Sequence, residues 1–167
     1  MDIWRDSKGV VPLLDDPTVK MEMFRWKRRP DLHLDVITQR VQTGQISQVD
    51  LDIAMTLVNA RLLTEKQLRF LYSKTMKGHK LGTRLRVLQQ IGWLEGWKIH
   101  SDFHDTEYVW SVGIAAKNFL SVCLGVTDVP NPMFLASSIK EQLFYPAVNE
   151  IRIQLFLKGL VEKEKFT

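Results

Sequence analysis

The hydrophobic pattern of this chain changes from helical to strand-like at Gly92, and this change constrains the fold more than any other feature. Before it, the segment KLGTRLRVLQQIG carries apolar residues on one side of a helix, at Leu81, Leu85 and Leu88. After it, two segments with a period of two, WLEGWKI and TEYVWSV, are separated by a polar loop. The chain is therefore expected to run from a leucine-rich helix directly into a β-hairpin.

Three further helices are expected ahead of the leucine-rich one. The first spans residues 31–43 and opens after Pro30. The second starts at an N-cap, Ser47, and ends near Ala60. The third follows a capping box, TEKQ, that begins at Thr64. From the second helix onward the order is helix, helix, helix, strand, turn, strand, so the expected fold class is a winged helix-turn-helix, mainly α with a small β-hairpin.

The chain of 167 residues is expected to have three parts. Residues 1–30 show no periodicity and predict an N-terminal arm, whereas residues 31–125 form the winged-helix domain. Residues 126–167 predict a C-terminal helical extension, with one or two helices broken or kinked at Pro146. Its apolar residues exceed what one such domain can cover, which predicts a homodimer with two DNA-reading helices for two half-sites. The alternative is that the extension packs back on its own domain, for instance against the helix of residues 31–43.

The positive charge of the chain is segregated, although the formal net charge is only +4. Between Glu65 and Glu95 there is no acidic residue, and the segment holds seven cations: Lys66, Arg69, Lys74, Lys77, Lys80, Arg84 and Arg86. A solvated surface is the ordinary explanation of a charge run. Here the charge coincides with the short helix, the turn and the leucine-rich helix, and this coincidence favours binding to double-stranded DNA.

Different residues are expected to contact the bases and the phosphates of the DNA. The leucine-rich helix carries polar residues opposite its leucines, and these are the candidates for reading base edges in the major groove: His79, Thr83, Arg86 and Gln90. The candidates for phosphate contacts are Thr64, Lys66, Lys74, Lys77, Lys80 and Arg84. A second basic run, interleaved with Phe24 and Trp26, is either a strap packed on the domain or an arm for the minor groove: Arg25, Lys27, Arg28 and Arg29.

Three parts of the chain resemble the replication-relaxation proteins of Gram-positive bacteria and their plasmids. The pair LLTEKQLRFLY and TRLRVLQQIGWLEGWKI is similar to the winged-helix core of that family, and YVWSVGIAAKNFL is similar to its strand followed by a helix. The segment YPAVNEIRIQL resembles the helix after the winged domain and is the most specific of the three. The resemblance covers about residues 48–158 and implies DNA binding in plasmid or mobile-element replication, relaxation or transcription control. Longer members continue into a further domain, whose activity is not carried over to this chain.

Other classes of function have less support. The sequence has no Gly-rich phosphate loop and no catalytic constellation, so neither an enzyme nor a bound cofactor is expected. A metal site is not expected either, because the only candidate is a pair of histidines and two acids in the hairpin loop: His100, Asp102, His104 and Asp105. The single cysteine, Cys123, is expected to be a buried, inert thiol.

The location and the alternative function follow from two further observations. No apolar run approaches the length of a membrane span and the N-terminus does not resemble a signal peptide, so a cytoplasmic location without a membrane partner is expected. The acidic hairpin loop would be repelled by a phosphate backbone. The alternative to DNA binding is therefore a winged-helix adaptor or regulator that binds another protein.

Overall fold

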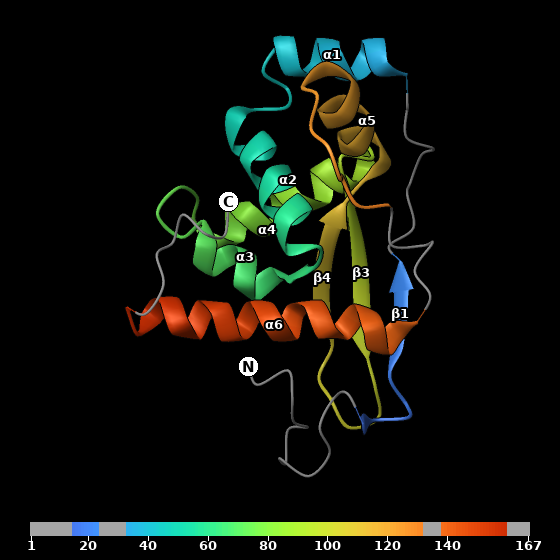
Figure 1. Ribbon diagram of the computed structural model, residues 1–167, viewed down its shortest axis with the longest axis vertical. Coiled ribbons are helices and arrows are strands. Elements are labelled where there is room, and N and C mark those ends of the chain that lie inside the picture. Colours follow the sequence, from blue (N-terminus) through green and yellow to red (C-terminus); the bar gives the residue numbers. More distant parts are fainter. Residues whose placement is uncertain (1–14, 24–32, 132–137, 160–167) are drawn as a thin grey trace.

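The computed structural model describes residues 15–23, 33–131 and 138–159 (Figure 1). This part of the chain is mixed α/β, with six helices and one antiparallel sheet of four strands in the order β1-β3-β4-β2. The elements are β1 (Lys20–Met23), α1 (Leu34–Gln42), α2 (Gln48–Ala60), β2 (Leu63–Thr64), α3 (Glu65–Leu71), α4 (Gly78–Gln90), β3 (Leu94–His100), β4 (Glu107–Val112), α5 (Ile114–Cys123) and α6 (Ile139–Leu157). None of the described helices is long and apolar enough to cross a membrane.

The local signals of the sequence place the helix ends where they were expected. Ser47 and Asp50 form a complete capping box at the start of α2, and Thr64 and Gln67 form another at the start of α3. Gly44 follows α1 with a φ of 75°, in the left-handed region that favours glycine. The four helices expected ahead of the hairpin and the two strands of the hairpin are confirmed.

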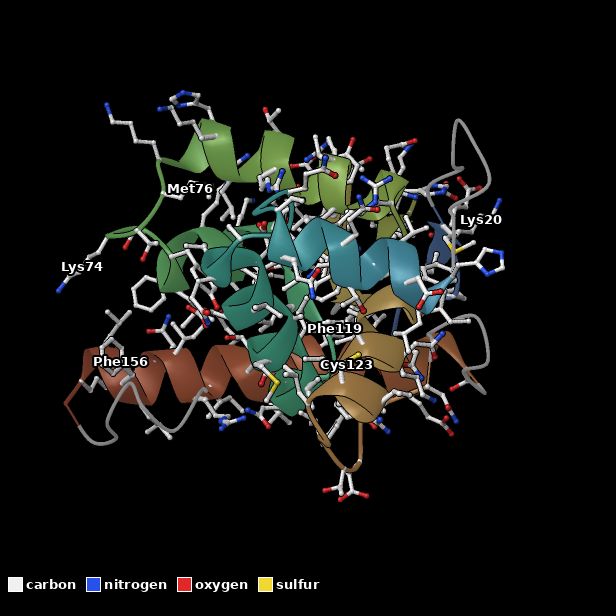
Figure 2. All side chains as sticks on the ribbon, turned by 90° about the horizontal axis from the view of Figure 1, so that it is seen from above. Lys20, Lys74, Met76, Phe119, Cys123 and Phe156 are labelled. Carbon is white, nitrogen blue, oxygen red and sulfur yellow. The ribbon has the colours of Figure 1, made fainter. Side chains whose placement is uncertain are left out.

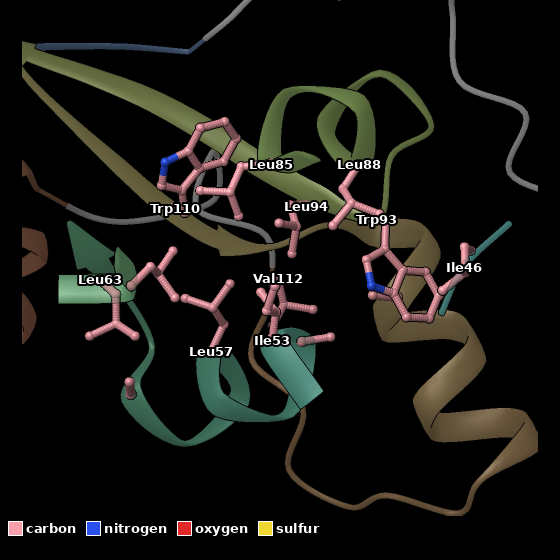
Figure 3. Packing of buried hydrophobic residues seen from close by; sticks show 14 of the residues in the cluster. Ile46, Ile53, Leu57, Leu63, Leu85, Leu88, Trp93, Leu94, Trp110 and Val112 are labelled. Atoms are coloured by element: carbon pink, nitrogen blue, oxygen red, sulfur yellow. The ribbon is translucent and has the colours of Figure 1, made fainter. Parts of the chain in front are cut away.

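The core lies between the sheet and helices α2, α4 and α5, and two tryptophans fill its centre (Figure 3). Trp93 and Trp110 are fully buried and lie among leucines of α2 and α4, including Leu57, Leu85 and Leu88. The indole of each tryptophan still finds an acceptor, because Trp93 Nε1 donates to the Asp50 carbonyl at 3.0 Å and Trp110 Nε1 donates to Glu65. The leucine stripe of α4 thus packs on the strands that follow it in the sequence.

The expected N-terminal arm is partly wrong, because residues 20–23 form an edge strand of the sheet. β1 pairs with β3 in antiparallel register, with Lys20 opposite His100 and Met23 opposite Trp97. Short strands give only a weak periodic signal, and four residues were too few to stand out from the irregular stretch around them. The cations expected to form a DNA-binding arm, Arg25, Lys27, Arg28 and Arg29, lie outside the described residues.

Asp16 fastens the N-terminal segment to the tip of the β3–β4 hairpin. Its carboxylate accepts hydrogen bonds from the backbone and side chain of Thr18 and lies 3.0 Å from Nδ1 of His104. Ser101 also contacts the His104 ring, at 3.0 Å. Burial alone would raise the pKa of Asp16, but the hydrogen bonds from Thr18, Ser101 and His104 lower it to about 2. The loop histidine therefore supports the fold through Asp16.

We expect Asp16 to contribute stability that depends on pH. Because its pKa in the folded protein is lowered from 3.8 to about 2, the contribution is complete above about pH 4 and is lost as the pH falls toward 2. Asp16→Asn should lower the urea midpoint of unfolding at pH 6, and the difference from the wild type should shrink between pH 4 and 2. A difference that stays constant over this range would contradict the assignment.

Among the described residues of the C-terminal extension, Ile139–Leu157 form one helix, α6, with Pro146 inside it, and this helix packs on its own domain. Asn149 of α6 is buried and its Nδ2 donates to the carbonyls of Ala60 and Leu62, at 2.9 and 3.0 Å. These carbonyls flank Arg61, which ends α2 with a positive φ. The alternative that the extension packs back is thus confirmed. Its main contacts are with α2, α3 and β2, instead of the helix of residues 31–43 that the sequence suggested.

Gly113 joins the end of β4 to α5 at a point where the backbone passes very close to Gly92. A Cβ at Gly113 would lie 2.2 Å from the Gly92 carbonyl oxygen and 2.8 Å from the Trp93 carbonyl carbon. This approach is fixed by hydrogen bonds from Gly113 N to Trp93 O and from Ala115 N to Gly92 O. No side chain fits without a shift of the backbone.

Gly113→Ala should therefore destabilise the protein by about 1–3 kcal/mol or more, the range for overpacking a close contact. Gly78→Ala is the matched control, because a Cβ there would meet Arg69 at an ordinary 3.6 Å in the first turn of α4. It should leave stability unchanged or slightly raised. Urea unfolding of both variants provides the measurement, and equal stability of the two would show that the close approach is absent.

Candidate nucleic-acid interface

Helix α4 has one buried face and one exposed face, as the leucine spacing predicts. Leu81, Leu85 and Leu88 are fully buried. On the opposite side the side chains of His79, Thr83 and Val87 are exposed, and Gln90 is partly exposed. Figure 2 shows α4 along one edge of the molecule, so this outer face is not covered by another described element. An exposed helix with polar side chains at successive turns has the shape that fits the major groove of DNA.

Val87 is a member of the outer face that the sequence analysis missed. Its side chain is 45% exposed although it is apolar. At 100° per residue it lies on the polar side of α4, next to Thr83. This helical angle could have predicted from the sequence that Val87 is exposed. It was overlooked because apolar residues in an amphipathic helix are normally assigned to the core.

Arg86 lies on the outer face with a side chain that is 44% exposed, but its guanidinium is engaged by groups of the fold. Its Nη1 donates to Glu65 Oε2 at 3.0 Å and to the Gly82 carbonyl at 2.9 Å. Its guanidinium also lies over the rings of Tyr108 and Trp110, at 5.2 and 5.7 Å from their centroids. Glu65 is buried and ion-paired with Arg69 as well. These contacts join α3, α4 and β4, so Arg86, an expected base reader, has its guanidinium bound to Glu65 while part of its side chain stays exposed on the outer face.

Arg84 is also structural, although it was expected to contact phosphate. Its Nε donates to Asp50 Oδ1 at 3.0 Å, and its Nη2 donates to the other carboxylate oxygen and to the Gln45 carbonyl. Asp50 is fully buried. Burial would raise the pKa of Asp50, but the hydrogen bonds from Arg84 and Ser47 lower it below its ordinary value. This bidentate pair locks α4 to the start of α2.

Two further phosphate candidates are engaged within the fold. Thr64 is buried, and its hydroxyl accepts the backbone N–H of Gln67 as the N-cap of α3. It therefore cannot face a phosphate, and the expectation was wrong. Lys66 is 56% exposed but its Nζ lies 3.4 Å from the Glu107 carboxylate. Burial raises the pKa of Glu107, and the charge of Lys66 opposes that shift.

The remaining phosphate candidates, Lys74, Lys77 and Lys80, cluster at the N-terminal end of α4. All three side chains are exposed, and none forms an ion pair or hydrogen bond with the part of the chain that the structure describes. Lys77 is the residue that precedes the helix and Lys80 lies in its first turn. The unpaired N–H groups and the positive helix dipole are at the same end. Among the positions expected to contact phosphate, the N-terminal end of α4 is therefore the most favourable for an anion.

The hairpin loop carries exposed acidic side chains, as the sequence indicates. Asp102 and Asp105 are exposed, and Phe103 between them is 46% exposed. Glu107, which follows the loop, is buried in β4 beside Lys66. No group of three or more metal-ligating side chains occurs in residues 15–23, 33–131 and 138–159. Cys123, expected to be buried, is exposed at the end of α5.

Comparison of the chain with protein-family models, curated proteins and solved structures finds no match. The resemblance to the replication-relaxation family therefore rests on the three quoted segments of the sequence. The geometry around α4 has to be interpreted by its own chemistry.

We expect Arg84→Ala to destabilise the protein by about 3–5 kcal/mol, because it leaves the buried Asp50 carboxylate without its cation. Lys80→Ala, four residues away on the exposed side of α4, should change stability by less than about 0.5 kcal/mol. Chemical denaturation of the two variants tests this difference. Equal effects would mean that Arg84 points to solvent, as the sequence alone suggested.

Proposed function

We propose that this protein binds double-stranded DNA through the outer face of α4 and the lysines at its N-terminal end. The fold we infer for residues 31–125 is a winged helix-turn-helix, in which α2, α3 and α4 precede the β3–β4 wing. One observation carries the proposal. α4 has no acidic residue, and three exposed lysines in its first turn and in the turn before it, Lys74, Lys77 and Lys80, form no ion pair or hydrogen bond with the described residues.

The outer face of α4 has the composition that major-groove contacts need. The ring of His79 can hydrogen-bond to base edges, and the hydroxyl of Thr83, which donates to the His79 carbonyl, can still accept. Gln90 donates to Gln89 through Nε2 and would have to exchange that bond to make the paired contact with adenine. Val87 offers an apolar surface for the methyl group of thymine. Specificity in this proposal comes from short, uncharged side chains together with a histidine, because Arg84 and Arg86 are held by acids of the fold.

Affinity in this proposal comes from the lysine cluster. Each phosphate that a lysine neutralises releases condensed counterions, which makes binding depend steeply on salt. Because the three lysines lie near the N-terminal end of α4, the phosphate contacts would be made at that end of the DNA-binding face. Phosphate contacts there would set the position of α4 in the groove without specifying sequence.

The biological setting follows only from the resemblance of the sequence. Plasmid or mobile-element replication, relaxation or transcription control is the context that the replication-relaxation family suggests. A non-catalytic role is part of this proposal. The setting is part of the proposal and not of the structural result.

Removal of the three lysines should abolish most of the salt-dependent affinity. For Lys74→Ala/Lys77→Ala/Lys80→Ala we expect weaker binding to a labelled random-sequence duplex and a salt slope smaller by about 2–3, at about 0.9 per lost phosphate contact. The control, Lys20→Ala/Lys98→Ala/Lys117→Ala, removes the same charge from β1, β3 and α5. Fluorescence anisotropy at about 50 and 200 mM salt tests both.

The outcome separates the site from the net charge. Equal losses in both triple variants would show that the total charge of the protein, and not α4, attracts DNA. No binding of the wild type at the lower salt would overturn the proposal.

A second function, binding of another protein through the hairpin tip, is favoured by one observation. Phe103 is an exposed aromatic side chain between two exposed acids, Asp102 and Asp105. Aromatic residues are typical of protein interfaces, and the flanking charge is unfavourable next to phosphates. An adaptor of this kind would select a basic partner and would bind no duplex in the anisotropy experiment.

A further inference from the structure

Helix α6 has a second apolar face, opposite the one that packs on its own domain. The inner face contains Leu143, Asn149 and Ile153, which are buried. The outer face contains Phe144, Val148 and Ile151, which are 59%, 36% and 60% exposed, and also the partly exposed Leu155. Packing within the domain therefore accounts for only half of the apolar residues of this helix.

The outer residues follow a heptad spacing. Phe144, Val148, Ile151 and Leu155 are separated by four, three and four residues, the pattern of the a and d positions of a coiled coil. We call this line of residues the seam of α6. One further step of three residues at each end extends it to Glu141 and to Lys158, which are both exposed. The seam is thus apolar in the middle, acidic at its N-terminal end and basic at its C-terminal end.

This order makes the seam complementary to itself in one orientation. If a second helix runs antiparallel, Val148 lies opposite the partner's Ile151, and Phe144 lies opposite the partner's Leu155. The same register brings Glu141 opposite the partner's Lys158 at both ends. A parallel pair would instead place glutamate on glutamate and lysine on lysine.

We propose that α6 pairs antiparallel with α6 of a second copy of this chain, through the seam from Glu141 to Lys158. Isolated helices of this length are only marginally stable in water. Here, however, the helix is already fixed to its domain by Asn149, Leu143 and Gln67, so pairing does not have to order it. An isologous contact of this type closes on itself as a dimer.

The position of α6 determines what such a dimer can do. α4 and α6 lie on opposite sides of the molecule when it is seen from above (Figure 2). A two-fold pair through the outer face of α6 therefore turns the two α4 faces away from each other. One straight duplex cannot reach both, so the expected arrangement of neighbouring half-sites is replaced by two separate duplex segments. This consequence rests on the proposed function of α4, whereas the pairing itself does not.

The pairing is tested by the mass of the full chain in solution as a function of concentration. The wild type should approach twice 19.4 kDa by light scattering or sedimentation, and Ile151→Lys should remain at 19.4 kDa with an unchanged circular dichroism spectrum. A wild type that stays monomeric at all concentrations, or an Ile151→Lys variant that still dimerises, would overturn the proposal. A monomer would leave the seam to a helix of another protein.

The orientation is tested by exchanging the charges. Glu141→Lys alone should weaken dimerisation at least several-fold, and Glu141→Lys/Lys158→Glu should restore it, because the antiparallel register pairs these two positions. The double variant also controls for the loss of an acid in the first turn of α6, since it contains the same lysine. In a parallel pair each position faces its own copy, so Glu141→Lys would exchange one like-charge contact for another and would not weaken dimerisation. Unchanged dimerisation of Glu141→Lys, or failure of the rescue, would overturn the orientation.

Bridging is tested with two duplexes, one attached to beads and one fluorescent in solution. The wild type should retain the fluorescent duplex on the beads, whereas Ile151→Lys should bind each duplex in anisotropy without retaining the second. Loss of anisotropy with an intact dimer would overturn the function of α4 alone. Retention by the monomeric variant would overturn the bridging role of α6.

Discussion

The carboxylate of Asp50 has no exposed surface, and the arrangement of three elements depends on what surrounds it. It closes the capping box of α2 with Ser47 and accepts both arms of the guanidinium of Arg84, while its carbonyl accepts the indole of Trp93. α2, α4 and the start of β3 therefore meet at one residue. A buried charge without its partner is costly, so α4 has one acceptable register on α2. The lowered pKa of Asp50 keeps that charge in place at neutral pH.

This constraint also decides which cations are available at the surface. The basic segment is used in two ways, because Arg84 and Arg86 neutralise the buried acids Asp50 and Glu65, whereas the lysines at the start of α4 have no such task. Arginine suits the buried role, since its planar fork can bind a carboxylate through two hydrogen bonds. The result is an outer face on which Arg86 is paired with Glu65, with lysines that have no ion pair among the described residues at its N-terminal end. On that arrangement, sequence selectivity and salt-dependent affinity belong to different residues.

The two surfaces that we consider functional are separated by the whole core. α4 lies behind α2 and α6 crosses in front of the sheet (Figure 1), while Trp93, Trp110 and the leucines of α2 and α4 fill the space between. Pairing of α6 would therefore leave the α4 face open. The same separation changes the expected consequence of dimerisation, from two half-sites on one duplex to two duplexes held by one dimer.

The sequence by itself determined the local structure. The capping boxes at Ser47 and Thr64, the leucine spacing of α4 and the change of period at Gly92 all act between residues close in the chain, so helices, hairpin and core face could be predicted from them. Only the tertiary structure decided which side chains contact one another across the chain. The packing of the elements brings Arg84 to Asp50 across 34 residues and Asp16 to His104 across 88. It also places residues 20–23 in the sheet. A local hydrophobic period cannot predict such contacts, because they join residues far apart in the sequence. Whether a charged side chain is exposed depends on which distant groups pack beside it.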